Sequence, residues 1–361
     1  VAGIATCSLG HSDRILRKKL SAQLKKVQHI SNLYKIEEQE ELSKYLTKQS
    51  CAESVFFCNS GAEANESAIK LIKKYGNTVH KGKESFILAA ESSFHGRTLA
   101  TLSATGQPKY QKGFEPMVKG FKFFKYNDIA SVKKLFEELK ENNQKASGIL
   151  VEPIQGEGGV IPGDKKFFKE LREICNQYNS LLILDEVQSG VGRTGKMWGY
   201  ENLEIEPDGF TLAKGLGGGH AIGALLVQKK ANIFTPGDHA STFGGNPFAC
   251  RAAITVLEEI KRRKILKNVF ERGNQLNEGF TKISAKFPNI ISGIRGLGLI
   301  QGLVINDSYT DAKTITLKAF DKGLLLVPAG GNVVRFVPPL IISRNEINIL
   351  LKKLDLVFEE M

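Results

Sequence analysis

The sequence predicts an α/β fold in which helices flank a mostly parallel central sheet, with a smaller α+β domain towards the C-terminus. Over roughly two thirds of the 361 residues, short apolar runs alternate with longer segments of helical periodicity, and this alternation ends after about Gly244. Such alternation is typical of α/β domains with a parallel sheet. A composition of 42% hydrophobic and 24% charged residues favours a packed globular chain over a disordered one.

The apolar runs are short enough for buried strands, and we expect parallel strands at 55–57, 86–89, 148–151, 181–184, 210–213 and 223–227. Helical periodicity predicts helices at about 62–75, 128–141 and 165–178, and an amphipathic segment at 14–27. After Gly244 we expect helices at 247–264, 268–286, 310–322 and 344–360, and strand-like stretches at 294–300 and 333–337. This pattern divides the chain into an N-terminal segment (1–30), a large domain (31–255) and a small domain (256–361).

Composition excludes several functional classes. The 50 Lys+Arg against 38 Asp+Glu give a charge of +12, but the lysines form scattered pairs on helical segments without interleaved aromatics. Solvated helix faces explain this pattern better than nucleic-acid binding. The five cysteines form no CxxC pair, which indicates reduced thiols rather than a disulfide framework or zinc site. Without a signal peptide or an apolar run of about 18 residues, a cytoplasmic protein that contacts no membrane is expected.

The residues that follow each strand are the candidates for chemistry, because ligands bind at the carboxyl ends of parallel strands. Ser60, Gly61 and Ala62 follow the first strand and open a helix. The free N–H groups and dipole of such a helix start suit a phosphate. Ser60 with Glu63 equally matches an ordinary capping box, and the segment alone does not decide between the two.

Two further strand ends carry polar or aromatic side chains. Phe94 and Arg97 follow the 86–89 run, and they could cover a planar ring and pair with a carboxylate, although a core Phe beside a surface Arg is also consistent. Asp185 closes the 181–184 run. A buried acid there needs a partner, which could be a metal, a base or a protonated ring nitrogen.

Lys214 is the most informative position, because it ends the 210–213 run and precedes a glycine-rich stretch. A desolvated lysine has a lowered pKa and can serve as a nucleophile or Schiff-base partner. Together with Asp185 and the helix start at Ser60, it describes one ligand, pyridoxal 5'-phosphate. Lys214 would take its aldehyde, Asp185 its ring nitrogen and the helix start at Ser60 its phosphate. No metal is required.

Six stretches of the chain resemble class-III aminotransferases, which are fold-type-I pyridoxal phosphate enzymes: 59–66, 94–97, 151–159, 185–195, 213–219 and 241–247. The resemblance spans essentially the whole chain and implies a homodimer with shared active sites. Stretches 29–34 and 328–340 are similar to the branch of the family that acts on N-acetylornithine in arginine biosynthesis. The family normally has an N-terminal arm before the position of Val1, so we expect one upstream.

The resemblance implies catalytic roles for two residues. Lys214 would hold the cofactor aldehyde and later shuttle the substrate proton, and Asp185 would pair with the ring nitrogen. Phe94 and Val187 would cover the two ring faces, and Gln188 would hydrogen-bond the ring hydroxyl. The full expected cofactor set is Ser60, Gly61, Ala62, Phe94, His95, Asp185, Val187, Gln188, Lys214 and Thr242 of the partner subunit.

The expected substrate-binding residues are Arg97, Glu157, Ser241 and Arg335. Arg97 would take the carboxylate remote from the reacting carbon. Glu157 and Arg335 resemble a switch pair, which releases the guanidinium only for a substrate with a second carboxylate, because an unpaired buried charge is costly. A permanent structural ion pair is the alternative.

The implied reaction moves the terminal amino group of N-acetylornithine to 2-oxoglutarate, giving N-acetylglutamate 5-semialdehyde and glutamate. The same residues would serve succinylornithine, ornithine, a lysine-pathway analogue or 4-aminobutyrate. A non-catalytic pyridoxal phosphate-binding module and a basic nucleic-acid binder are rivals from other classes. Intact Lys214, Asp185, Arg97 and Arg335 argue against the first, and the lack of a recognised motif argues against the second.

Overall fold

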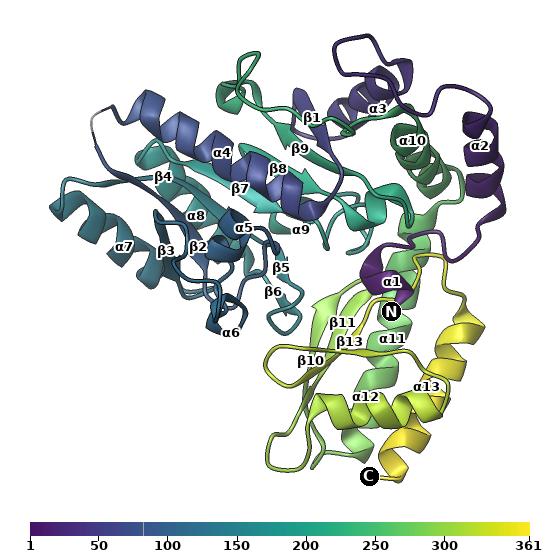
Figure 1. Cartoon of the computed structure of the whole chain (residues 1–361). Coiled ribbons are helices and arrows are strands. Elements are labelled where there is room, and N and C mark those ends of the chain that lie inside the picture. The colour runs from purple at the N-terminus through teal and green to yellow at the C-terminus, as the bar shows by residue number, and fades with distance from the viewer. Residues whose placement is uncertain (82) are drawn as a thin grey trace.

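The centre of the molecule is a seven-stranded sheet, in the order β1-β9-β8-β7-β4-β2-β3, in a computed structural model that describes residues 1–81 and 83–361 (Figure 1). The strands are β1 (Ser54–Cys58), β2 (Ser85–Ala90), β3 (Phe121–Phe124), β4 (Lys145–Val151), β7 (Leu181–Asp185), β8 (Gly209–Leu212) and β9 (Gly223–Val227). Strands β3, β2, β4, β7 and β8 run parallel to one another, as expected for a mostly parallel sheet. Strand β3 had no counterpart among the predicted strands.

The expectation of a parallel strand at 223–227 is wrong, because β9 pairs antiparallel with both β8 and β1. The connection between β8 and β9, residues 213–222, holds only a short 3-10 turn, η1 (Lys214–Gly217). A parallel pair would need a crossover of about a dozen residues or more. The chain therefore returns as a hairpin, and Lys214 lies in its loop.

Alternate residues of the central strands face two helical layers. Leu150 and Ile183 pack with Ile69 of helix α4 in one apolar cluster, whereas Ile149 and Leu182 belong to the other cluster, which contains α7 and α8. This is the period of two that a strand buried on both faces requires. The helices and short strands of this part are α1 (Ala2–Ala5), α2 (Arg14–Leu24), α3 (Glu37–Lys48), α4 (Gly61–Val79), α5 (Leu99–Ala104), α6 (Pro108–Gln111), α7 (Ile129–Glu141), α8 (Lys165–Gln177), α9 (Tyr200–Leu203), α10 (Pro247–Arg262), η2 (Lys229–Ala231), β5 (Ile154–Gln155) and β6 (Ile161–Pro162).

The C-terminal part is a four-stranded antiparallel sheet covered by helices, below the central sheet in Figure 1. Its elements are α11 (Ile265–Lys286), β10 (Ile291–Leu297), β11 (Ile300–Ile305), α12 (Ala312–Asp321), β12 (Val327–Ala329), β13 (Val333–Phe336) and α13 (Arg344–Glu359). The stretch expected as one strand at 294–300 is two strands, which are joined at Gly298. Gly298 has φ +54°, a conformation that a glycine adopts at little cost and that lets the chain reverse there.

Helix α11 belongs to both parts of the molecule. Ile265 and Val269 on its first half lie in the core of the central sheet, whereas Leu276 and Phe280 lie in the core of the C-terminal sheet. The expected domain boundary between residues 255 and 256 falls inside α10, and the division into domains stays a prediction.

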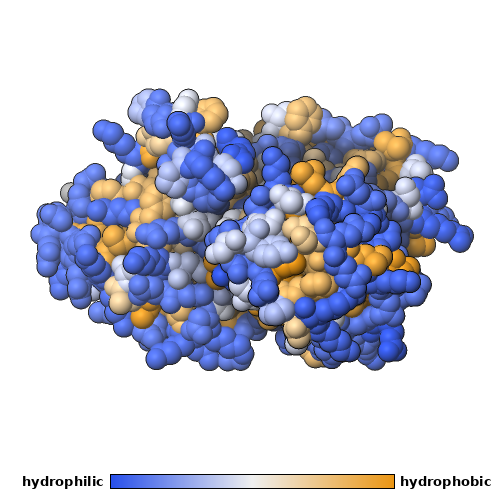
Figure 2. All heavy atoms as spheres, turned by 90° about the horizontal axis from the view of Figure 1, so that it is seen from below, coloured by the Kyte–Doolittle hydropathy of each residue, from blue (hydrophilic) through white to orange (hydrophobic). Residues whose placement is uncertain are grey.

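The outer surface of the molecule is largely hydrophilic on the face shown in Figure 2. Figure 2 shows hydrophilic side chains over most of the face seen from below, with smaller apolar areas between them. Over residues 1–81 and 83–361, no helix is both long and apolar enough to cross a membrane.

Candidate active site

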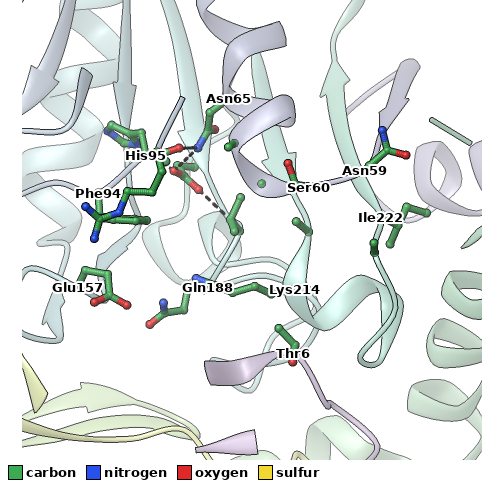
Figure 3. A pocket seen from close by; sticks show the side chains of 18 of the residues that line it. Thr6, Asn59, Ser60, Asn65, Phe94, His95, Glu157, Gln188, Lys214 and Ile222 are labelled. Carbon is green, nitrogen blue, oxygen red and sulfur yellow. Dashed lines mark hydrogen bonds and ion pairs between the residues drawn. The ribbon is translucent and has the colours of Figure 1, made fainter. Parts of the chain in front are cut away.

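A cavity of about 480 Å³ lies at the carboxyl ends of β1, β2, β4, β7 and β8 (Figure 3). The sheet brings to it eleven of the residues that the sequence singled out: Ser60, Gly61, Ala62, Phe94, His95, Arg97, Glu157, Asp185, Val187, Gln188 and Lys214. These residues come from five separate strand ends, so their convergence is a consequence of the parallel topology.

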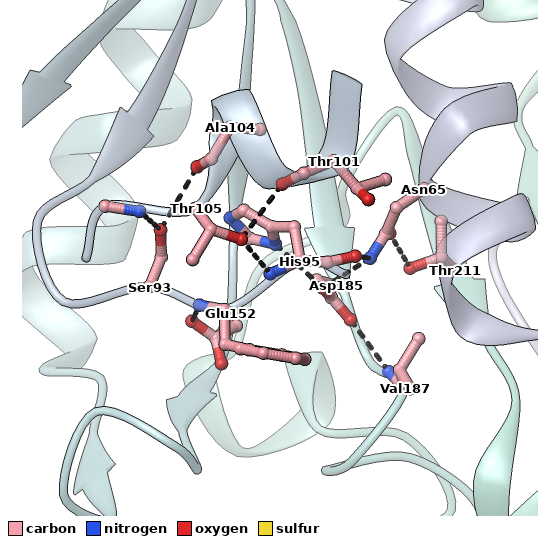
Figure 4. Close-up of polar contacts among 12 residues, drawn as sticks. Asn65, Ser93, His95, Thr101, Ala104, Thr105, Glu152, Asp185, Val187 and Thr211 are labelled. Carbon is pink, nitrogen blue, oxygen red and sulfur yellow. Dashed lines mark hydrogen bonds and ion pairs between the residues drawn. The ribbon is translucent and has the colours of Figure 1, made fainter. Parts of the chain in front are cut away.

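Asp185 is the buried centre of a hydrogen-bond network (Figure 4). Its Oδ2 accepts from Asn65 Nδ2 at 2.7 Å and from His95 Nδ1 at 2.8 Å, and its Oδ1 accepts the N–H of Val187 at 3.0 Å. Asn65 is itself oriented by Thr211, whose hydroxyl donates to Asn65 Oδ1 at 2.8 Å. Three donors compensate the burial of one carboxylate and hold it in one orientation, facing the cavity.

The start of helix α4 combines the cap and the anion site that the sequence left as alternatives. Ser60 caps the helix by accepting the N–H of Glu63 at 3.2 Å, and the Glu63 carboxylate accepts the N–H of Asn59 at 2.7 Å. Within the described residues, the N–H groups of Gly61 and Ala62 have no protein acceptor. Two free N–H groups at a helix N-terminus favour an anionic ligand such as a phosphate.

Gly61 also permits the close approach of the next strand end. A Cβ at this position would lie 2.7 Å from Cγ1 of Val187, which is closer than van der Waals contact allows. The absence of a side chain therefore lets the wall formed by Val187 pack against the helix start.

Lys214 lies in the hairpin loop between β8 and β9, with its backbone at φ +34°. Burial lowers the pKa of its amine below the usual 10.5, and the opposing attraction of Glu157 and Asp185 does not restore it. Positive φ is rare for a residue with a side chain and carries strain. A desolvated amine that lines a cavity, carried on a strained backbone, fits a lysine that forms a covalent bond to a carbonyl.

Arg335 of the C-terminal sheet forms an ion pair with Glu157, which lines the cavity. Arg335 on β13 donates through Nη1 to Glu157 Oε1 at 2.6 Å and to Gln188 Oε1 at 3.0 Å. Arg335 is 1% exposed, whereas the side chain of Glu157 is 22% exposed. Arg335 does not itself line the cavity, but both of its partners do.

Phe94 and Arg97 also line the cavity. Phe94 is half-buried, and Arg97 is exposed at the rim, so Phe94 is not an ordinary core residue. Glu152 beside them accepts the N–H of Phe94 at 3.2 Å. Burial, and secondarily the charge of Asp185, raises the pKa of Glu152 well above its usual 4.5, which favours the neutral acid.

Ser241 and Thr242 are not in the cavity of this chain. They line a neighbouring hollow with Phe56 and Gly244, and Thr242 is exposed. Ser241 is connected to the cavity through Asn59, whose Nδ2 donates to its hydroxyl at 3.2 Å. The structure therefore leaves Thr242 available for a neighbouring subunit, and its assignment stays a prediction.

Among the residues that the sequence analysis did not name as site residues, Asn65 and Glu152 line the cavity, and Thr211 orients Asn65. Asn65 lies about one helical turn after Ser60, so its position on the same face as the cap could have indicated a role. Glu152 directly follows β4 and Asp185 closes β7, so the search for polar residues at strand ends applied to both. Thr211 had no signal, because it lies inside an apolar run.

The donor set suits pyridoxal phosphate and does not suit a metal. Among the described residues there is no cluster of three His, Cys, Asp or Glu side chains that could hold a metal ion. The cavity instead offers a lysine amine, a carboxylate held by three donors and two free N–H groups at a helix start. These match an aldehyde, a protonated ring nitrogen and a phosphate.

Comparison with known proteins identifies the family. The model of the aminotransferase class-III family matches residues 1–358. The chain belongs to the class-III aminotransferases. This aminotransferase is 98% identical over 361 residues to the acetylornithine aminotransferase of Prochlorococcus marinus subsp. pastoris (strain CCMP1986 / NIES-2087 / MED4), covering 100% of this chain and 87% of the relative.

Solved structures of other aminotransferases share the fold. N-acetylornithine aminotransferase from Stenotrophomonas maltophilia K279a superposes with a TM-score of 0.85 at 36% identity, covering 99% of this chain and 89% of the other. Ornithine aminotransferase from Toxoplasma gondii gives a TM-score of 0.92 at 29% identity, covering 99% and 84%, and holds PLP at partial occupancy in its active site. The fold-type-I class, the transaminase activity and the pyridoxal phosphate dependence expected from the sequence are confirmed.

Proposed function

We propose that this transaminase moves the terminal amino group of N-acetylornithine to 2-oxoglutarate, as a step of arginine biosynthesis. The near-identical Prochlorococcus relative bears the name acetylornithine aminotransferase. The observation that carries the proposal is the contrast between the two guanidiniums. Arg335 is paired with Glu157, whereas Arg97 has no carboxylate partner among the described residues. Such a site suits a substrate with one carboxylate, placed far from its reacting amine.

The proposal assigns the cofactor to the residues that converge on the cavity. Gly61 and Ala62 would bind the phosphate through their N–H groups, with the Ser60 hydroxyl beside them. Asp185 would face the ring nitrogen, and Phe94 and Val187 would cover the ring. When bound, pyridoxal phosphate supplies an aldehyde for the amine and a ring that accepts the electron pair released from the substrate carbon.

Lys214 is the group that moves the proton. Because burial lowers the pKa of its amine, the uncharged form that can act as a base is more populated near neutral pH than for an exposed lysine. The charges of Glu157 and Asp185 are close enough to favour the protonated amine once it has taken the proton. Lys214 Nζ can therefore hold a proton from the substrate carbon and return it to a neighbouring position.

The Glu157–Arg335 pair would let one site accept two unlike substrate ends. The amine end of N-acetylornithine carries no carboxylate, and the pair stays closed beside it. The reacting end of 2-oxoglutarate carries one, and Arg335 would exchange Glu157 for that carboxylate. Because Glu157 is partly exposed, its side chain can turn towards solvent when Arg335 releases it.

A homodimer in the cytoplasm completes the proposal. Thr242 is exposed in a hollow beside the site, on the same loop as Ser241, which contacts the cavity wall through Asn59. Thr242 of the partner subunit would add its hydroxyl to the phosphate site, and Ser241 would help to shape the substrate entrance.

The main rival is a class-III aminotransferase for ornithine or another ω-amine. Half-reaction absorbance assays on the purified holoenzyme, with N-acetylornithine, ornithine, succinylornithine and 4-aminobutyrate in turn, separate these activities by their kcat/KM values. We expect N-acetylornithine to give the highest value. A higher value for any of the other three would overturn the assignment.

The assignment of Lys214 has its own test. Borohydride reduction of the yellow holoenzyme, followed by digestion and mass spectrometry, should place the trapped cofactor on the peptide with Lys214. An adduct on any other lysine would contradict the proposed site. A Lys70→Arg variant is the matched control, because Lys70 lies on the outer face of α4, bonded to the carbonyl of Asp238.

A further inference from the structure

Arg97 is held by aromatic rings rather than by a carboxylate. Its guanidinium carbon lies 4.0 Å from the ring centroid of Tyr110 and 5.2 Å from that of Phe94. The two rings meet edge to face, with centroids 5.9 Å apart and planes at 86°. Over the described residues, no Asp or Glu lies within ion-pair distance of Arg97.

Tyr110 is fixed in place independently of Arg97. It lies on the single turn of α6, and the neighbouring Gln111 donates through Nε2 to the carbonyls of Leu102 at 3.2 Å and Thr105 at 3.0 Å. Gln107, just before α6, donates to the carbonyl of Ser93 at 3.0 Å. The turn is thus tied both to the end of α5 and to the loop that carries Phe94, which holds the backbone of Tyr110 in place.

We propose that Tyr110 is a positioning residue for substrate recognition, whose ring holds the charged Arg97 guanidinium in place without pairing it to a carboxylate, ready for a remote substrate carboxylate. A ring face attracts a cation and restricts its orientation without using any of its N–H donors. The donors that form a bidentate pair with a carboxylate therefore stay free. This inference rests on the role given to Arg97 under the proposed function.

An acid that contacts the residues just after Arg97 does not interfere with this arrangement. Glu66 on α4 accepts from the Thr98 hydroxyl and from the N–H of Thr101 at 3.3 Å, so its charge is directed at the start of α5. Lys109 adds a second cation, with Nζ 4.8 Å from the Tyr110 ring centroid. The end of the cavity at Arg97 is therefore cationic and unpaired before substrate binds.

The contrast with Arg335 explains why a ring suits this end. Arg335 must be neutralised during one half of the reaction, and Glu157 does so at 2.6 Å. Arg97 would meet a carboxylate in both halves: the α-carboxylate of N-acetylornithine and the carboxylate of 2-oxoglutarate remote from its oxo group. A permanent carboxylate partner there would compete with both substrates, whereas an aromatic ring competes with neither.

The test compares Tyr110→Leu, which removes the ring, with Tyr110→Phe, which keeps it. In the holoenzyme, Tyr110→Leu should raise KM for 2-oxoglutarate and for N-acetylornithine about tenfold, with kcat changed less than about twofold. Tyr110→Phe should retain wild-type KM values. The dissociation constant of glutarate, a dicarboxylate that cannot react, should rise by the same factor in calorimetry. Tyr309→Leu, at an exposed tyrosine of the C-terminal part, is the matched control.

A third substrate separates positioning from general damage. N-acetyl-1,4-diaminobutane has the reacting amine of N-acetylornithine but no carboxylate, so its kcat/KM should be the same in Tyr110→Leu and wild type. Arg97→Lys keeps the charge but loses the flat guanidinium, and it should raise the same KM values even if Tyr110→Leu fails to fold. In an Arg97→Gln background, Tyr110→Leu should add less than about a twofold change.

Three results would overturn the proposal: unchanged glutarate affinity in Tyr110→Leu, equal losses in Tyr110→Phe, or an equal loss of activity with the carboxylate-free amine. The glutarate measurement does not depend on which amine the enzyme prefers. A wild-type preference for ornithine would therefore refute the proposed function and still leave the role of Tyr110 open to this test.

Discussion

Replacing Glu157 with Gln removes the charge that neutralises Arg335 while it keeps the shape of the side chain. The two side chains meet at 2.6 Å between Arg335 Nη1 and Glu157 Oε1, and Arg335 is 1% exposed. Removing one partner of a fully buried ion pair costs about 3–5 kcal/mol. Glu157 is 22% exposed, and Gln188 Oε1 still accepts from Arg335 at 3.0 Å, so we expect a smaller cost, about 2 kcal/mol.

This cost should fall on one half of the reaction. Bound N-acetylornithine excludes water from Arg335 without supplying a carboxylate to it, and an unpaired guanidinium would also attract the α-carboxylate into an unproductive orientation. About 2 kcal/mol corresponds to a loss of about 30-fold in kcat/KM for the amine half-reaction. 2-Oxoglutarate brings its own carboxylate, so its half-reaction should keep its rate and its KM should stay equal or fall.

Stopped-flow absorbance of the two half-reactions measures both quantities on one preparation of the Glu157→Gln variant. Glu170→Gln makes the same chemical change at a surface ion pair with Lys133 and should leave both halves at wild-type values. Equal losses in the two half-reactions would refute the reasoning and leave a permanent structural ion pair as the explanation.

Three other variants test the structure at separate points. Gly61→Ala places a Cβ 2.7 Å from Val187 Cγ1, so cofactor affinity measured by fluorescence titration should fall by about 1–3 kcal/mol; unchanged affinity would contradict the close packing. Burial raises the pKa of Glu186 from 4.5 to about 8, so the folded state binds the proton more tightly. Stability from this group is complete below pH 4.5 and lost as pH rises to 8, and the unfolding free energy of wild type should fall by up to about 1.4 kcal/mol per pH unit relative to Glu186→Gln. If urea denaturation gives the same pH dependence of the unfolding free energy for wild type and Glu186→Gln, this prediction is wrong. Arg193→Met leaves two buried carbonyls of the C-terminal part, now bonded to Arg193 Nη1, without a donor, and should lower the unfolding free energy by about 2–4 kcal/mol; a loss below about 0.5 kcal/mol would show that water replaces the guanidinium.

Most of what the sequence predicted about the site came from one rule, that ligands bind at the carboxyl ends of parallel strands. Ser60, Asp185 and Lys214 each follow an apolar run, and in the structure all three line one cavity. The rule works because parallel neighbours end at the same edge of a sheet, so adjacency in space follows from topology without any knowledge of side-chain contacts.

Properties that depend on direction and on tertiary contacts were beyond the sequence. An apolar run such as Gly223–Val227 has the same composition whether its strand runs up or down, and only the short connection before it indicates the reversal. Tyr110 follows no strand and lies near Arg97 only because α6 folds back onto the Phe94 loop. Contacts of this kind have no local signal in the order of residues.

Helix α11 couples the unfolding of the two sheets. At 22 residues it is about 33 Å long, with Ile265 in one apolar core and Phe280 in the other. Loosening either core exposes one half of this helix and removes support from the other half, because hydrogen bonding along the helix is cooperative. The two sheets are therefore coupled in unfolding, and heat or denaturant should melt them in one transition. In a fragment that holds only the C-terminal sheet, the first half of α11 would lack the core against which it packs. The C-terminal sheet is therefore poorly suited to exchange between relatives as an independent module.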